Sequence, residues 1–298
     1  MHPVLNRLID NFRARTPLRT GSLIVTIFGD CVSTRGGEVW LGSLIDLLDP
    51  LQISHRLVRT AVFRLVQDNI LTNEQIGRRS FYRLTTQGQL EFNAATERIY
   101  SNPSPLWDGQ WLTVLSHLVD PPHKAEVKTI LAAAGLAQLS SDTFAHPCAD
   151  VSLLHSPAAK QPYLDQLIFC RGHFQTNHPD TLQQLVRRSW PLAELDHAYA
   201  AFIEQFAPVA GSQLVTLSPQ DAFLVRTFLV HEYRKVLLRD PGLPDALLPA
   251  DYRRTDAYSI AKEIYLALQA LSEQYVDQAF VTRHGPLPPY AAQPRFVS

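Results

Sequence analysis

The chain has 298 residues, of which 46% are hydrophobic and 18% charged, and its formal net charge at pH 7 is −1. This composition is typical of an ordered globular protein with room for several domains, and it excludes a disordered chain. No apolar run approaches the roughly 18 residues of a membrane span, and the first residues lack the layout of a secretory signal. Three scattered cysteines argue against a disulfide framework. We therefore expect a cytoplasmic protein without membrane contact.

Charge is unevenly distributed along the chain. Residues 54–83 hold six arginines against Asp68 and Glu74, a local net charge of +4 in a nearly neutral protein. Such a cluster indicates a local anionic partner, although ordinary variation in surface charge is an equally good interpretation of the count alone.

The first block of the chain alternates helical patterns with short β-type runs. In chain order these patterns predict helices over 20–34, 43–51 and 55–69, and strands over 38–41, 70–75 and 80–85. Ser54 is the predicted N-cap of the third helix, because its hydroxyl can accept a free backbone N–H. Gly77 can take the positive φ that a tight turn between the last two strands requires. This order predicts a winged helix-turn-helix whose third helix enters the DNA major groove.

The third predicted helix has two chemically different sides when it is projected at 100° per residue. Its expected core side consists of Leu57, Val58, Ala61, Val62 and Leu65, and its opposite side carries three arginines and no acid. Arginine can donate two hydrogen bonds to guanine, glutamine can pair with adenine, and threonine can contact a thymine methyl group. The hairpin arginines are expected on phosphates. The predicted DNA-contacting residues are Ser54, Arg56, Arg59, Thr60, Phe63, Arg64, Gln67, Gly77, Arg78, Arg79 and Tyr82. For Phe63, packing against the hairpin or the second helix is the alternative.

The rest of the chain predicts two further domains. Residues 101–109 contain two prolines and a glycine and predict a linker. Residues 110–185 combine a helix with β-type runs, and the chain is largely helical from about 186 onward. We therefore expect an α+β multidomain protein with a DNA-binding domain over 1–100, a small α+β domain over 101–185 and a helical domain over 186–298.

Several segments carry a family resemblance. They are RGGEVWLGSLIDLLDPL, ISHRLVRTAVFRLVQD, GRRSFYRLTTQG, IYSNPSPLWDGQW and HEYRKVLLRDPGLPDALLPADY. Together they resemble the PaaX family, repressors of bacterial phenylacetic acid degradation. The resemblance implies a homodimeric repressor that binds a palindromic operator in double-stranded DNA and is released by an aryl-acyl-CoA, phenylacetyl-CoA. It also implies a ferredoxin-like middle domain, similar to a CRISPR-associated small nuclease. One departure is Tyr252, where the family has tryptophan.

An acyl-CoA site needs cations for its phosphates and apolar walls for its acyl end. The predicted helix around residues 231–239 supplies the candidate effector-binding residues His231, Tyr233, Arg234, Lys235 and Arg239. Lys235 and Arg239 form a predicted i,i+4 cationic pair, which is repulsive unless an anion lies between them. Internal ion pairs with Glu232 and Asp240 are the alternative explanation.

Catalytic, metal and cofactor sites are not predicted. Cys170 and His173 form a C-x-x-H motif, but with Cys148 it lacks a convincing fourth ligand. Two alternative hypotheses stay open. One is a nuclease that uses the middle domain with Asp120 as its acid, and the other is a winged helix that serves only protein–protein contacts.

Overall fold

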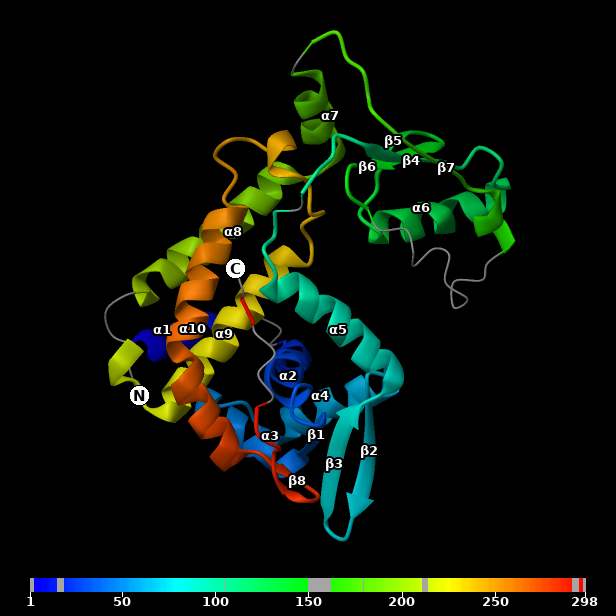
Figure 1. Cartoon of the computed structure of the whole chain (residues 1–298). Helices are drawn as coiled ribbons and strands as arrows, with labels where there is room; N and C mark the ends of the chain where they lie inside the picture. Colours follow the sequence, from blue (N-terminus) through cyan, green and yellow to red (C-terminus); the bar gives the residue numbers. More distant parts are fainter. Residues whose placement is uncertain are drawn as a thin grey trace. The chain divides into compact units, whose positions relative to one another are not determined.

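The computed structural model describes residues 3–14, 19–104, 106–149, 162–178, 180–210, 214–290 and 295–296. It is a mixed α+β structure that packs as two compact units (Figure 1). The first unit comprises Met1–Asn102, Ala200–Leu238 and Asp256–Ser298, and the second comprises Pro103–Tyr199 and Arg239–Thr255. Each unit therefore combines segments from distant parts of the sequence. Among the described residues, no helix has the length and apolar character needed to cross a membrane.

The first unit is mainly helical. Its helices are α1 (Pro3–Arg13), α2 (Thr20–Ile27), α3 (Leu41–Leu48), α4 (His55–Gln67), α5 (Thr86–Tyr100), the end of α8 (Leu192–Phe206), α9 (Pro219–Leu237) and most of α10 (Arg254–Ala279). Strands β1 (Glu38–Trp40), β2 (Leu71–Ile76) and β3 (Arg79–Leu84) form an antiparallel sheet in the order β1-β3-β2. Strands β8 (Val281–Thr282) and β9 (Gly285–Pro286) form a second, short hairpin.

The elements predicted between residues 20 and 85 agree with the structure in kind and order. The predicted strand over 38–41 ends at Trp40, because Leu41 begins α3. The predicted helix over 20–34 is α2 followed by a π-helical turn, Phe28–Val32. A single π-helical turn of this kind is often associated with a functional position in a helix.

Helix α9 forms the centre of the first unit. Every residue from 222 to 231 is buried, as expected for a helix that is covered on all sides. It contacts α1, α2 and α5, and the rings of Phe12 and Phe228 lie 5.4 Å apart. Its N-cap is Ser218, whose hydroxyl accepts a hydrogen bond from the Asp221 backbone N–H at 3.1 Å.

A buried ionic cluster joins the π-helical turn to α9, α10 and the end of the chain. The Asp30 carboxylate pairs with Arg226 at 3.0 Å and with Arg295, and it accepts hydrogen bonds from the hydroxyls of Tyr100 at 2.6 Å and Tyr265 at 3.0 Å. Burial acts to raise the pKa of Asp30, but the two guanidinium groups and the two phenols outweigh it and hold that pKa below its ordinary value.

The second unit contains a four-stranded antiparallel sheet in the order β5-β6-β4-β7. Its elements are β4 (Trp111–Leu115), α6 (Lys124–Ala133), β5 (Ala137–Ser140), β6 (Thr143–His146), β7 (Ile168–Gly172), α7 (Thr181–Ser189) and the start of α8. One hydrophobic cluster contains Leu112, Val127 and Phe144, and a second contains Trp111 and Trp190. Alternate residues of β4 thus supply both cores, as the two faces of a strand should.

Residues 186–199 and 239–255, assigned by the sequence to the C-terminal domain, pack in the second unit. There the Arg254 guanidinium pairs with Asp240 at 3.4 Å and with Asp245 at 2.6 Å. Tyr252, the departure from the family pattern, donates its hydroxyl to Asp240 at 2.8 Å, a bond that a tryptophan ring cannot reproduce with the same atom. The unit boundary at residues 102 and 103 lies within the predicted linker. The division into three domains stays a prediction.

Candidate nucleic-acid interface

Helix α4 is fixed at its start and along one side. The Ser54 hydroxyl accepts a hydrogen bond from the Leu57 backbone N–H at 3.3 Å, which confirms the predicted N-cap. Val58, Ala61, Val62 and Leu65 are buried, and the helix packs against α2 and α3. The prediction that Leu57 belongs to this core is wrong, because its side chain is 44% exposed. It lies about 90° from the centre of the buried stripe when the helix is projected.

The opposite side of α4 faces outward and carries the predicted DNA-contacting side chains. Its exposed residues are Arg56, Arg59, Thr60, Phe63, Arg64 and Gln67. Phe63 is 60% exposed, which favours its prediction as an outward-facing residue over the alternative of packing against the hairpin or the second helix. In the part of the chain that the structure describes, no carboxylate lies within 4.0 Å of the three guanidinium groups, and Asp49 instead lies 3.9 Å from the His55 Nε2 atom at the start of the helix. The arginines are therefore available to a partner.

The β2–β3 hairpin presents two more arginines at its tip. Strand residues Ile76 and Arg79 pair directly, which leaves Gly77 and Arg78 as a two-residue turn. Gly77 has a φ of 59°, as predicted, in the left-handed region that glycine enters without strain. Arg78 and Arg79 are exposed, and the Arg79 guanidinium stacks 4.9 Å from the centroid of the Trp40 ring.

Tyr82 shows that α4 and the hairpin form one surface. It lies on β3, paired with Val39 on β1 and Asn73 on β2. Burial raises the pKa of the Tyr82 phenol, and the positive charge of Arg59 opposes that rise. Arg59 on α4 is thus close enough to act on a side chain of the hairpin, and α4 also packs against β2, so the two elements lie side by side.

Acidic side chains on this sheet are neutralised from the other end of the chain. Arg283, which lies between β8 and β9, pairs with Glu38 at 2.5 Å and with Glu74 at 2.8 Å. Its hydrogen bonds lower the pKa of the Glu38 carboxyl. Sequence reasoning missed Arg283, because 245 positions separate it from Glu38 and no local pattern links them. The pairing leaves the hairpin surface more positive than its local sequence indicates.

Four of the five predicted effector-binding residues lie on α9, but they do not share one site. His231 is buried with its Nδ1 3.0 Å from the Thr26 hydroxyl, and Tyr233 is buried with its ring 5.4 Å from that of Phe202. Lys235 pairs with Glu232 at 3.1 Å. The predicted i,i+4 pair is wrong, because α9 ends at Leu237 and Arg239 lies beyond it. In the second unit Arg239 pairs with Glu194.

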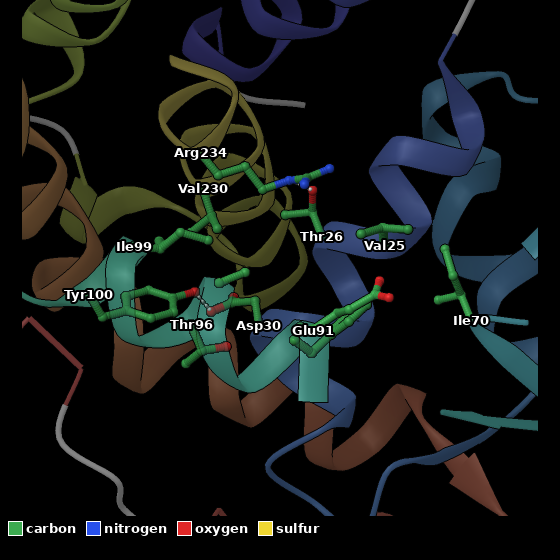
Figure 2. Close-up of a pocket in the computed structure, with 13 residues that line it drawn as sticks. Val25, Thr26, Asp30, Ile70, Glu91, Thr96, Ile99, Tyr100, Val230 and Arg234 are labelled. Carbon is green, nitrogen blue, oxygen red and sulfur yellow. Dashed lines mark hydrogen bonds between the residues drawn. The ribbon is translucent and has the colours of Figure 1, made fainter. Parts of the chain in front are cut away.

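Among the predicted effector-binding residues, Arg234 lines a cavity that the described residues form, and Figure 2 shows this pocket in close-up. The cavity has a volume of about 190 Å³ and is bounded by α2, the π-helical turn, α5 and α9. Its other lining residues are Val25, Thr26, Gly29, Asp30, Ile70, Glu91, Phe92, Ala95, Thr96, Ile99, Tyr100 and Val230. Sequence reasoning missed these residues, because they come from separate helices and share no motif.

Known proteins match most of this chain. The model for PaaX-like protein matches residues 19–88, and the model for PaaX-like protein C-terminal domain matches residues 190–278. The Escherichia coli (strain K12) protein named Transcriptional repressor PaaX is 35% identical over 296 residues, covering 95% of this chain and 91% of that protein. The solved structure of the uncharacterized protein Rv0674 from Mycobacterium tuberculosis covers 84% of this chain and 95% of its own, with a TM-score of 0.55 at 18% identity, and is alike in fold. Given a relative of this identity over nearly its whole length, the chain belongs to the PaaX family.

Proposed function

We propose that this protein is a DNA-binding transcriptional repressor of an aromatic, phenylacetate-type catabolic operon, released by an aryl-acyl-CoA such as phenylacetyl-CoA. The observation that carries the proposal is the outward side of α4. It holds three arginines without a carboxylate within 4.0 Å among the described residues, beside a hairpin with two more exposed arginines. The name of the 35% identical relative, Transcriptional repressor PaaX, supports the same role.

In this proposal residues 20–84 act as a winged helix-turn-helix. The support is the order of α2, α3, α4 and the β2–β3 hairpin, with β1 completing the sheet. Helix α4 enters the major groove, where Arg56 and Arg59 reach base edges, and Arg78 and Arg79 hold phosphates of the adjacent backbone. Winged-helix repressors that bind palindromes do so as dimers, so we also propose a homodimer on a two-fold symmetric operator.

The sheet of the second unit supports the proposed ferredoxin-like domain. Its spatial order β5-β6-β4-β7 places the first strand of the unit between the third and fourth, with every neighbouring pair antiparallel. That is the order expected of a β-α-β-β-α-β chain. Helix α6 occupies the first helical position, and between β6 and β7 the structure describes a 3-10 helix, Pro162–Gln166.

Release by an effector requires two states of the repressor with different affinities for DNA. A ligand that binds the weaker DNA-binding state more tightly shifts the population toward that state. The extent of the shift is set by the ratio of the two ligand affinities, and so it is measurable as a change in apparent operator affinity.

A mobility-shift titration on the DNA upstream of the protein's own gene tests the proposal. We expect a discrete complex at low salt that is dissolved by phenylacetyl-CoA and not by coenzyme A or acetyl-CoA. Retention of no DNA at low salt would contradict the proposal and favour a protein–protein role. Cleavage of DNA with a divalent metal, abolished in Asp120→Asn, would instead favour the nuclease hypothesis.

A further inference from the structure

The cavity in the first unit has the size and the walls of a small-molecule pocket. Its apolar walls come from Val25 on α2, Phe92 and Ile99 on α5, and Val230 on α9, with Ile70 completing them. An apolar protein cavity of about 150 Å³ is known to hold benzene. A volume of about 190 Å³ therefore holds one aromatic ring with a short substituent, and it is too small to enclose a coenzyme.

One side chain of this pocket is a cation with an unusual set of partners. The Arg234 guanidinium donates to the Ser22 carbonyl at 2.7 Å, the Ser22 hydroxyl at 2.8 Å and the Thr26 hydroxyl at 2.8 Å. These partners are neutral, and no carboxylate of the described residues lies within 4.0 Å of Arg234. Burial lowers the pKa of this guanidinium and outweighs the opposing influence of Tyr100 and Glu232, which reflects the cost of holding the charge away from water. An oxygen of a ligand would offset that cost.

The acids that line the pocket are otherwise engaged. Asp30 is paired with two arginines, as described above, and Glu91 accepts a hydrogen bond from Gln87 on its own helix at 2.8 Å. Glu91 is also exposed, so it belongs to the solvent side of the pocket. Arg234 and the apolar side chains Val25, Ile99 and Val230 line the same pocket (Figure 2), which suits a ligand with an acceptor oxygen at one end and an apolar part at the other.

The same guanidinium is connected to the proposed DNA-binding helix through α2. Ser22 follows Gly21, and a Cβ atom at Gly21 would lie 4.0 Å from the Cβ of Ala61 on α4. The turn of α2 that Arg234 holds is therefore the turn that packs closely on α4. A ligand oxygen that competes with Ser22 for the Arg234 donors would weaken the hydrogen bonds between Arg234 and α2. Binding in the pocket would thereby change the placement of α4.

We propose that this pocket binds the acyl end of the effector, a single-ring aryl group on a short acyl chain, with Arg234 donating to the acyl oxygen. The identity of the effector rests on the proposed function. The chemistry of the bound group is inferred from the pocket alone. The acyl group is the part that a free aryl carboxylate and an aryl-acyl thioester share. In the thioester the coenzyme lies outside the pocket, because the volume admits the acyl end only.

Direct binding to the full chain tests the site, measured by isothermal titration with phenylacetate and, separately, with phenylacetyl-CoA. The decisive variant is Ala95→Leu, which adds three carbon atoms to a pocket-lining position on α5. Its matched control is Ala94→Leu, the same change at the preceding, exposed position of that helix, which does not line the pocket. We expect Ala95→Leu to weaken the better ligand at least about tenfold and Ala94→Leu to leave its affinity unchanged.

A second variant, Arg234→Gln, tests the role of the charge. If the free acid is the ligand, loss of the guanidinium should weaken it by roughly ten- to a hundredfold, because a charged pair is lost. If the thioester is the ligand, the retained amide donor should limit the loss to less than about tenfold. Thermal unfolding shows whether each variant is folded. If Arg234→Gln is not folded, Ala95→Leu still tests the site.

The outcomes separate the site from the proposed function. If phenylacetyl-CoA releases the wild-type protein from DNA but binds Ala95→Leu as tightly as wild type, the pocket assignment is wrong and the repressor function stands. If no acyl-CoA releases the protein, but a probe binds wild type and not Ala95→Leu, the pocket stands and the proposed effector response is wrong. Wild-type protein that binds neither probe would overturn the pocket assignment.

Discussion

Two groups of arginines in the first unit have opposite surroundings. The α4 arginines (Arg56, Arg59 and Arg64) are exposed and have no carboxylate within 4.0 Å among the described residues. The buried arginines (Arg35, Arg226 and Arg295) are 5% exposed or less, and each pairs with at least one acid. Removing a guanidinium from water is costly unless a carboxylate compensates it. A buried arginine therefore needs an internal partner, whereas an exposed one keeps its donors for an external partner.

The difference teaches that internal pairing, not residue type, separates the buried structural arginines from the arginines that we propose to bind DNA. Arg226 pairs with Asp30 and with Glu273 at 2.6 Å, and it thus joins the π-helical turn to α10 through α9. Arg59 has no such role inside the fold, but it lies close enough to Tyr82 to act on its phenol. Substitutions in the first group should consequently change stability, and those in the second should change DNA affinity.

The largest effect is expected from Asp30→Asn. The change keeps the size of the side chain but removes the charge that compensates Arg226 and Arg295, and breaking a buried ion pair in this way costs about 3–5 kcal/mol. Urea unfolding followed by circular dichroism measures the loss. The matched control is Asp10→Asn on the exposed side of α1, which should change the free energy of unfolding by less than about 0.5 kcal/mol. Equal effects of the two changes would contradict the structural role of the cluster.

The same substitution should alter the dependence of stability on pH. The folded-state pKa of Asp30 lies below the ordinary value of 3.8, so near that pH the unfolded state binds more protons than the folded state. The stabilisation is complete above pH of about 4 and is lost as the pH falls through the folded-state pKa. The acid-induced decline of stability should accordingly be shallower in Asp30→Asn than in the wild type over that range.

The next largest effect is expected from Arg59→Ala, and it should appear in DNA binding alone. Loss of a base-contacting arginine should reduce operator affinity by about 1–3 kcal/mol and relax specificity at one position. The free energy of unfolding should stay within about 0.5 kcal/mol of wild type, because the side chain is exposed. Mobility shifts on a set of single-base operator variants measure both properties. A large loss of stability with unchanged specificity would place Arg59 in the structural group.

Local signals in the sequence were sufficient to predict α4 and the hairpin. The Ser54 cap, the spacing of Val58, Ala61, Val62 and Leu65, and the positive φ of Gly77 are all determined by neighbouring residues. The helical projection also placed the arginines on the outward side. It failed for Leu57, which lies at the edge of the apolar stripe, whereas it placed Phe63 on the outward side, where the ring is 60% exposed.

The buried arginines could not be predicted, because their partners are distant in sequence. Arg35 and Glu273 are 238 positions apart, and Arg295 and Asp30 are 265 apart. The end of α9 was also misplaced. Leu238 and Arg239 continue its periodicity, but the helix stops at Leu237 before the Asp240-Pro241-Gly242 turn. The pocket around Arg234 likewise has walls from four separate segments, so no single stretch of sequence indicates it.

A smaller effect is expected from Arg78→Ala at the tip of the hairpin. A phosphate contact carries no sequence information, so the variant should bind all operator variants more weakly by a similar factor. Each phosphate neutralised contributes about 0.9 to the slope of log affinity against log salt, so this slope should become shallower by about 1. Titrations at several salt concentrations, with Arg59→Ala alongside, measure it. A loss of affinity confined to particular sequences would instead assign Arg78 to base contacts.

The smallest effect is expected from Arg79→Ala. Arg79 has features of both groups of arginines. It is exposed like the α4 arginines, yet its guanidinium stacks 4.9 Å from the Trp40 ring and so links β3 to β1. An exposed cation–π contact contributes about 0.5–1 kcal/mol, so urea unfolding should show a loss of that size which Arg78→Ala does not show. Stacking leaves the guanidinium edge free to donate to a phosphate, and Arg79→Lys should therefore retain more DNA affinity than Arg79→Ala. If Arg79→Ala leaves stability unchanged, the stacking contributes nothing to the fold, and Arg79 belongs wholly with the exposed arginines.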